Sequence, residues 1–139
     1  MHVDGQCHCG VLAFTAEVDP ESVTVCHCTD CQAMSGSAFR ANIACPADAF
    51  HFVRGEPAIY VKTAESGAKR RMAFCAACGG QIYSSAEHEP KSYALRTGTI
   101  SQRAAFAPAK QIWMRSAVPW ARDALDGVPA FATEASPSS

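Results

Sequence analysis

Seven of the eight cysteines in this sequence stand in clusters, at spacings that allow their thiolates to share a metal ion. The clusters are Cys7 with Cys9, Cys26 with Cys28 and Cys31, and Cys75 with Cys78. A structural zinc has four protein ligands, whereas a catalytic zinc has three and keeps one position open for water or substrate. We therefore expect the central three cysteines to form an open catalytic zinc site. The two outer pairs are then left to close a four-thiolate structural site between them.

A disulfide framework is the alternative use of an even number of cysteines. The first residues contain neither a basic start nor an apolar run, so they do not resemble a secretory signal. The two cysteines of a Cys-x-Cys pair in an extended chain share one face at a fixed spacing, which suits chelation better than a disulfide. We expect reduced, metal-bound thiols in a cytoplasmic protein.

Two glycines, Gly79 and Gly80, follow the pair Cys75 and Cys78 directly. This sequence is typical of a zinc knuckle, whose tight turn directs backbone N–H groups at the sulfurs and needs glycine at a positive φ. The alternative is a thioredoxin-like redox pair, which would begin a helix within a βαβ unit. No amphipathic helical pattern follows Cys78, so the sequence favours the knuckle.

Short β-rich runs separated by turn signals must position these clusters. We expect strands at residues 11–18, 22–25, 39–45, 50–54, 58–62, 69–74, 81–84 and 93–97, and a short helix at 119–125. The central cluster would then lie at a strand end and in the loop after it. Cys45 alternates in phase with the apolar residues of its strand, so we expect it in the core. The sequence therefore predicts an all-β fold of packed antiparallel sheets with little helix.

Length and charge narrow the classes of partner. The 139 residues predict a single domain over residues 1–131, and the polar composition after Phe131 predicts a disordered tail at 132–139. A net charge of −1 offers no electrostatic footprint for nucleic acid. No apolar run approaches the roughly 18 residues that a membrane helix needs. We expect a small-molecule partner, no nucleic acid and no membrane, and the oligomeric state is left open.

These motifs resemble those of the glutathione-dependent formaldehyde-activating enzyme family, whose relatives include centromere protein V. The resemblance is carried by residues 5–10, 26–32, 35–39 and 74–79, with weaker similarity at 96–99, 112–113 and 119–120. The similarity therefore extends from residue 3 to residue 131 in the order of the family.

The resemblance implies a β-tent fold of packed antiparallel sheets. It also implies a structural zinc on Cys7, Cys9, Cys75 and Cys78, and a more labile catalytic zinc on Cys26, Cys28 and Cys31. The implied activity is that of a carbon–sulfur lyase working in reverse, which condenses glutathione with formaldehyde to S-hydroxymethylglutathione.

A zinc held by three thiolates is an electron-rich centre, which suits it to binding a thiol better than to activating water. Coordination deprotonates a thiol that would otherwise be mostly protonated at neutral pH. We hypothesise that the open zinc receives the glutathione sulfur and presents it as a nucleophile to a small carbonyl compound. The proton donor is not identified: His27 and His51 are candidates, although His27 should point away from the metal as a solvent-facing or supporting residue.

Other residues have both a functional and a plain interpretation. The turn Ser35, Gly36 and Ser37 could contact a peptide-like substrate, or could be only a turn. The basic run 69–71 (Lys69, Arg70 and Arg71) could bind a glutathione carboxylate, or could be a solvated strand face. Trp113 and Trp120 are expected in the core or at its rim.

A non-enzymatic zinc module for protein interaction or thiol sensing is the competing function. It predicts one tightly bound zinc per chain, and no effect of small thiols on the metal. Chromatin association, suggested by centromere protein V, lacks a basic tract in this sequence.

Overall fold

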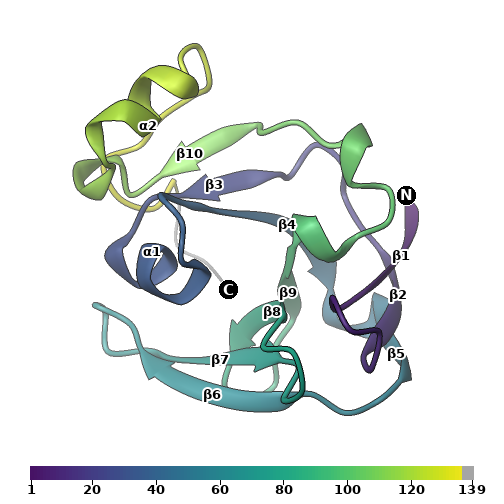
Figure 1. Ribbon diagram of the computed structural model, residues 1–139. Coiled ribbons are helices and arrows are strands. Elements are labelled where there is room, and N and C mark those ends of the chain that lie inside the picture. Colours follow the sequence, from purple (N-terminus) through teal and green to yellow (C-terminus); the bar gives the residue numbers. More distant parts are fainter. Residues whose placement is uncertain (136–139) are drawn as a thin grey trace.

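The computed structural model describes residues 1–135, and within them the chain forms mostly short strands (Figure 1). The strands are β1 His2–Gln6, β2 Ala13–Glu17, β3 Thr24–Cys26, β4 Arg40–Pro46, β5 Phe50–Arg54, β6 Ala58–Thr63, β7 Lys69–Phe74, β8 Gln81–Ala86, β9 Ser92–Arg96 and β10 Lys110–Ile112. The α-helices are α1 Thr29–Ser35 and α2 Pro119–Ala124. The predicted all-β class with little helix is confirmed.

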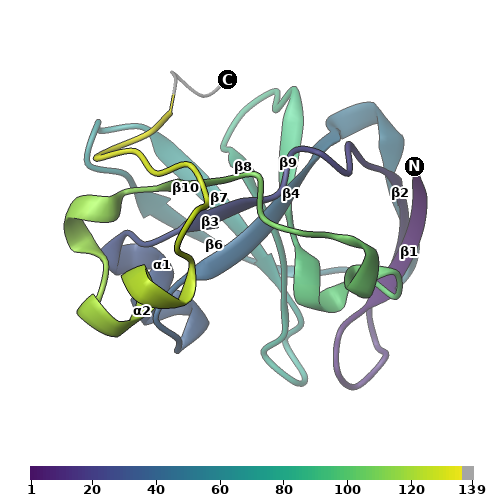
Figure 2. The ribbon, with the colours of Figure 1, turned by 90° about the horizontal axis from the view of Figure 1, so that it is seen from above.

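The strands form two sheets, one of three strands in the order β1-β2-β5 and one of seven in the order β10-β3-β4-β9-β8-β7-β6. Neighbouring strands are antiparallel except β10 and β3, which are parallel. Figure 2 shows the small sheet at one end of the molecule and the two helices at the other. Packed antiparallel sheets were therefore predicted correctly, apart from this one parallel pair.

The large sheet has one apolar face and one polar face because side chains alternate along each strand. On the apolar face, Ile43 is paired with Leu95, and both are fully buried against the small sheet. Cys45 lies in the same core and is also fully buried, as predicted. From the small sheet, the ring of Phe14 stacks on that of Phe50 at 5.1 Å.

The polar face of the large sheet curves around helix α1. In Figure 1, β10 and β3 lie above this helix, and β7 and β6 lie below it. Two ion pairs join the two sides: Lys62 of β6 contacts Asp30 of α1 at 2.9 Å, and Arg115 contacts Glu65 at 2.6 Å. The polar face is therefore the inner wall of a groove.

The prediction of a loop after the central cysteines is wrong in part, because residues 29–35 form helix α1. The Sγ of Cys28 accepts a hydrogen bond from the N–H of Cys31 at 3.2 Å and so caps the first turn. Gly36 ends the helix at φ 66°, a conformation that glycine adopts without steric cost. Strand β1 was not predicted, because Val3 is its one large apolar residue.

The C-terminal end of the described chain still takes part in backbone hydrogen bonding. The carbonyls of Ala132 and Thr133 accept from the N–H groups of Arg115 and Trp113. These two residues belong to the tail predicted at 132–139, of which residues 136–139 lie outside the described part. Within the described residues, no helix combines the length and apolar character needed to cross a membrane.

Candidate metal centres

The outer cysteine pairs meet although about 65 residues of chain separate them. Their four sulfur atoms lie within 4.8 Å of one another. The Sγ of Cys9 is 3.7 Å from that of Cys7 and 3.7 Å from that of Cys75. A tetrahedron of thiolates around zinc, with Zn–S bonds of about 2.3 Å, has edges of about 3.8 Å. The four sulfurs therefore fit a closed zinc site.

Backbone geometry supports thiolates at this cluster. The N–H of Leu12 donates to the Sγ of Cys7 at 3.3 Å, and the N–H of Cys78 lies 3.5 Å from the Sγ of Cys75. Gly79 has φ 78°, and its N–H bonds to the carbonyl of Cys75 at 2.8 Å. Cys75 to Cys78 thus form a tight turn rather than a helix start, which agrees with the knuckle and not with a redox pair.

The central cluster is formed by the end of β3 and the start of α1. Cys26 ends the strand, Cys28 caps the helix, and Cys31 lies in the first helical turn. Their sulfurs also lie within 4.8 Å of one another, and no fourth His, Cys, Asp or Glu of the described residues joins them. Cys28 is half-buried while the other two are buried. Three donors open on one side fit a zinc that has a free position.

The three thiols of this cluster do not ionise equally. Hydrogen bonds from the Cys26 and Cys31 thiols lower the pKa of Cys28, and the backbone N–H of Cys31 and the charge of Lys62 lower it further. The same sharing with Cys28 raises the pKa of Cys26. Cys28 is therefore the most acidic of the three thiols.

A groove of about 1080 Å³ opens beside the central cluster, along the polar face of the large sheet. The basic side chains that line it are Arg40, Lys62, Lys69, Arg70, Lys110 and Arg115, and the acidic ones are Asp30, Glu65 and Glu134. The Lys62–Asp30 and Arg115–Glu65 ion pairs neutralise two of these basic side chains and two of the acidic ones. Positive charge therefore remains in excess in the groove, although the net charge of the chain is −1.

The family model described as glutathione-dependent formaldehyde-activating enzyme matches residues 2–116 of this chain. The chain belongs to this family. The description of the family names glutathione and formaldehyde, and the two cysteine clusters of this chain could each hold a metal ion.

A solved structure of a Rhodobacter sphaeroides protein has a similar fold. The similarity covers 92% of this chain and 99% of that protein, at 19% sequence identity and a TM-score of 0.58. At this identity the likeness supports the fold alone. No curated protein matched the chain.

The turn of Ser35, Gly36 and Ser37, for which a contact with substrate was one interpretation, does not line the large groove. Ser35 is exposed at the end of α1 and lines a second, smaller cavity. Gly36 is the helix cap, and the N–H of Ser37 bonds to the Oγ of Ser35 at 3.3 Å, but neither residue lines either cavity. Ser35 is therefore the one residue of this turn placed beside a binding space.

Neither candidate proton donor faces the groove. His27 is fully buried, packs against the ring of Phe39, and its Nε2 lies 2.8 Å from the Oε1 of Gln111. The solvent-facing alternative for His27 is therefore wrong. His51 is exposed on β5 in the small sheet, away from both cavities.

The remaining sequence candidates divide between groove and surface. Lys69 and Arg70 line the groove, but Arg71 does not. Trp113 lines the groove, with Arg115 4.8 Å above its ring, while Trp120 is exposed on α2.

Sequence reasoning missed the polar residues of β4 and β9 that surround the central cluster. Arg40 is paired with Cys26, and Asn42 with Arg96, so their side chains share the groove face. The alternation that predicted Cys45 in the core also sends residues 40 and 42 to the opposite face. It could have indicated Arg40 and Asn42, but not their pairing with Cys26 and Arg96.

Proposed function

We propose that this protein is a zinc-dependent carbon–sulfur lyase-type enzyme that forms or cleaves S-hydroxymethylglutathione. The observation that carries the proposal is the three-sulfur cluster, open on the side of Cys28 beside a positively charged groove. Family membership supports the substrates, and the geometry of the cluster supports the metal.

Cys26, Cys28 and Cys31 would hold the catalytic zinc, and Cys7, Cys9, Cys75 and Cys78 the structural one. When bound at the central cluster, zinc supplies a site where an incoming thiol is kept as thiolate. In the reaction the glutathione sulfur forms a bond to the aldehyde carbon, and the carbonyl oxygen takes up a proton. Cleavage is the reverse, in which the hydroxyl loses its proton as the carbon–sulfur bond breaks.

The groove binds and orients the thiol through charge. Glutathione carries two carboxylates and one ammonium group, so it is an anion at neutral pH. Arg70 and Lys69 line the groove on the side of β7, opposite the cysteines on β3 and α1. The excess of basic side chains therefore favours an anionic thiol over a neutral one.

Lys62 is the best-placed proton donor among the groove residues. Its side chain is 17% exposed, it is held by Asp30 at 2.9 Å, and its charge acts on Cys28. An ammonium group in the groove near the cluster can donate to the oxygen as negative charge develops there. Lys62→Met should therefore lower kcat more than it raises KM.

The experiment is to follow formaldehyde by NMR with zinc-loaded protein, with and without glutathione. Wild type should consume formaldehyde faster than the uncatalysed condensation, and Cys28→Ser should abolish this excess. Cys45→Ala is the matched control, because Cys45 lies in the core away from both clusters. Absence of any excess rate in wild type would overturn the activity. A single bound zinc unaffected by Cys28→Ser would favour the non-enzymatic zinc module instead.

A further inference from the structure

A second cavity of about 380 Å³ is lined by residues that follow each cysteine cluster in the sequence, among them Ser35 after Cys31 and Gly79 after Cys78. Its walls come from the end of α1, the start of β4, the glycines after Cys78 and the end of β9. Arg40 and Arg96 both line this space, and we refer to it as the arginine cavity. Arg40 also lines the large groove, so it forms part of the wall between the two spaces.

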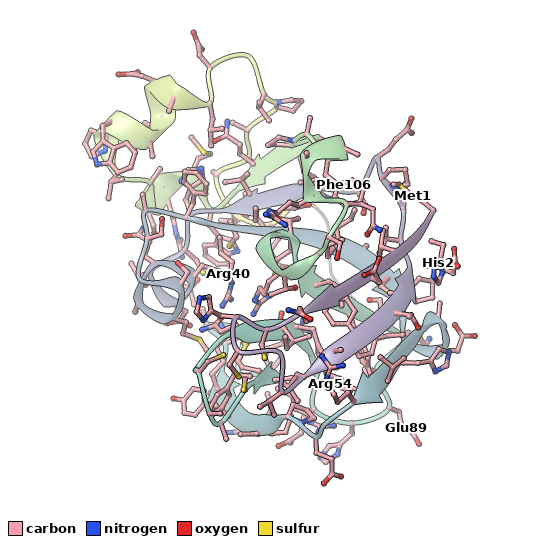
Figure 3. The ribbon with its side chains drawn as sticks, turned by 45° about the vertical axis from the view of Figure 1, so that its right-hand side comes forward. Met1, His2, Arg40, Arg54, Glu89 and Phe106 are labelled. Atoms are coloured by element: carbon pink, nitrogen blue, oxygen red, sulfur yellow. The ribbon has the colours of Figure 1, made fainter. Side chains whose placement is uncertain are left out.

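Arg40 is buried with most of its hydrogen-bonding capacity unused. It is 7% exposed, and Figure 3 shows it in the interior of the molecule beside helix α1. Within the described residues, its Nη1 donates to the Oε1 of Gln81 at 3.1 Å, and its Nε has no partner. A guanidinium offers five donors, and Gln81 is the one described acceptor that the side chain of Arg40 reaches.

Arg96 is 6% exposed and bonds to neutral groups. Its Nη1 donates to the Oδ1 of Asn42 at 2.7 Å and also approaches Ser84 and the carbonyl of Ala94, while its Nη2 contacts the sulfur of Met72. Its Nε has no partner among the described residues. These contacts fix the position of the guanidinium but leave its charge unbalanced.

No described carboxylate forms an ion pair with Arg40 or Arg96. Burial and, next, the nearby charge of Arg40 lower the pKa of Arg96 to about 9, which leaves its guanidinium cationic at neutral pH. A buried charge without a counter-charge is destabilising, and an anionic ligand would supply that counter-charge.

We propose that the arginine cavity binds a carboxylate group through the guanidinium groups of Arg40 and Arg96. The planar fork of arginine matches a carboxylate with two parallel hydrogen bonds. If the proposed function holds, on which this source of the ligand rests, the carboxylate is one of those of glutathione. A free small carboxylate is the other source of the same chemistry.

The test measures binding to the full zinc-loaded chain by calorimetry, without any reaction. The probes are S-methylglutathione, whose sulfur is blocked, the same compound with both carboxylates amidated, and acetate. Arg40→Lys and Arg96→Lys keep the charge but remove the fork. Arg122→Gln is the control, because Arg122 is exposed on α2 and lines neither cavity.

We expect each lysine variant to bind S-methylglutathione at least about tenfold more weakly than wild type, since charged hydrogen bonds are lost. The amidated probe should bind weakly and equally to all variants, and Arg122→Gln should match wild type. Arginine-dependent binding of acetate, with no arginine dependence for S-methylglutathione, would assign the cavity to free carboxylates. Unchanged binding of both carboxylate probes in the lysine variants would overturn the proposal.

Two further readouts separate the possible failures. If Arg96→Lys does not fold, Arg40→Lys still tests the proposal. The side chain of Arg40 makes a single hydrogen bond to the described residues, so its replacement disturbs the fold less. If wild type binds S-methylglutathione through the arginines but does not consume formaldehyde, the cavity assignment stands and the proposed reaction falls.

Discussion

The Nε2 of His27 lies 2.8 Å from the Oε1 of Gln111, and both side chains are buried. The Nε2 of Gln111 donates to the carbonyls of Leu125 and Val128, so its oxygen must accept and His27 must donate. The hydrogen bond therefore fixes the His27 tautomer with the proton on Nε2. It also ties the segment between Cys26 and Cys28 to the chain after α2.

Gln111→Leu should destabilise the protein by about 2–4 kcal/mol. The substitution leaves His27 and two backbone carbonyls without their partner, and each unsatisfied buried group costs about 1–3 kcal/mol. Urea unfolding of the zinc-loaded protein measures this loss. Gln102→Ala is the control, since Gln102 bonds to Asp4 at the surface and its removal should cost less than about 1 kcal/mol. Equal losses for the two variants would contradict a structural role for the His27 contact.

Gly5→Ala should lower the unfolding free energy by about 1–3 kcal/mol, the usual cost of overpacking. A Cβ at Gly5 would lie 2.4 Å from the ring of Phe14 and 2.4 Å from the carbonyl oxygen of Thr99, so β1 would have to move. Gly98→Ala is the matched control because nothing lies within 4 Å of a Cβ there. Thermal melts of the two variants should differ clearly, and coincident melts would refute the close approach of β1.

Cys75→Ser and Cys28→Ser should each remove one metal ion but differ in their effect on the fold. Cys75 is fully buried and joins the end of β7 to the turn after β1, so loss of its metal removes a link between distant segments. Cys28 lies at the groove, and its loss should leave the β-sheet circular dichroism unchanged. Zinc content by mass spectrometry, compared with thermal stability, checks both. Equal stability of the two variants would contradict the division into structural and open sites.

Alkaline pH should destabilise wild type through Cys45. Burial raises the pKa of its thiol from 9.0 to about 11. Below pH 9 the thiol is neutral in both the folded and unfolded states, and the stabilisation is fully present. Between pH 9 and 11 the unfolded state ionises first, so the free energy of unfolding falls with rising pH. Cys45→Ala should show a shallower fall across this window in urea titrations, and identical slopes would argue against the buried thiol as the cause.

The sequence predicted the strands well where short runs are bounded by strong turn residues. Residues 50–54 and 69–74 match β5 and β7, because Gly55, Pro57 and Gly67 mark their limits. Helix α1 was missed because it has seven residues and is capped by a cysteine, which is not a usual capping residue. Short helices of this kind are held by tertiary contacts more than by propensity.

The cysteine clusters were accessible from sequence because thiols at short spacing have few other uses. The basic lining of the site was not, because it depends on strand register. Arg96 is brought beside Asn42 by pairing between strands that lie 54 residues apart in the sequence. Alternation along one strand assigns a face to a residue, but it does not say which distant residue stands opposite.

The ion pairs across the groove connect side chains, whereas the strands beneath are connected by backbone hydrogen bonds. Widening the groove mouth therefore requires separating Lys62 from Asp30 and Arg115 from Glu65, with every strand pairing left in place. A solvent-exposed pair such as Arg115 with Glu65 is worth about 1 kcal/mol or less, and such pairs weaken as ionic strength rises. Dissolved salt should thus have two opposed effects on this protein: it loosens the entrance for a ligand and at the same time screens the charge that draws an anion toward it.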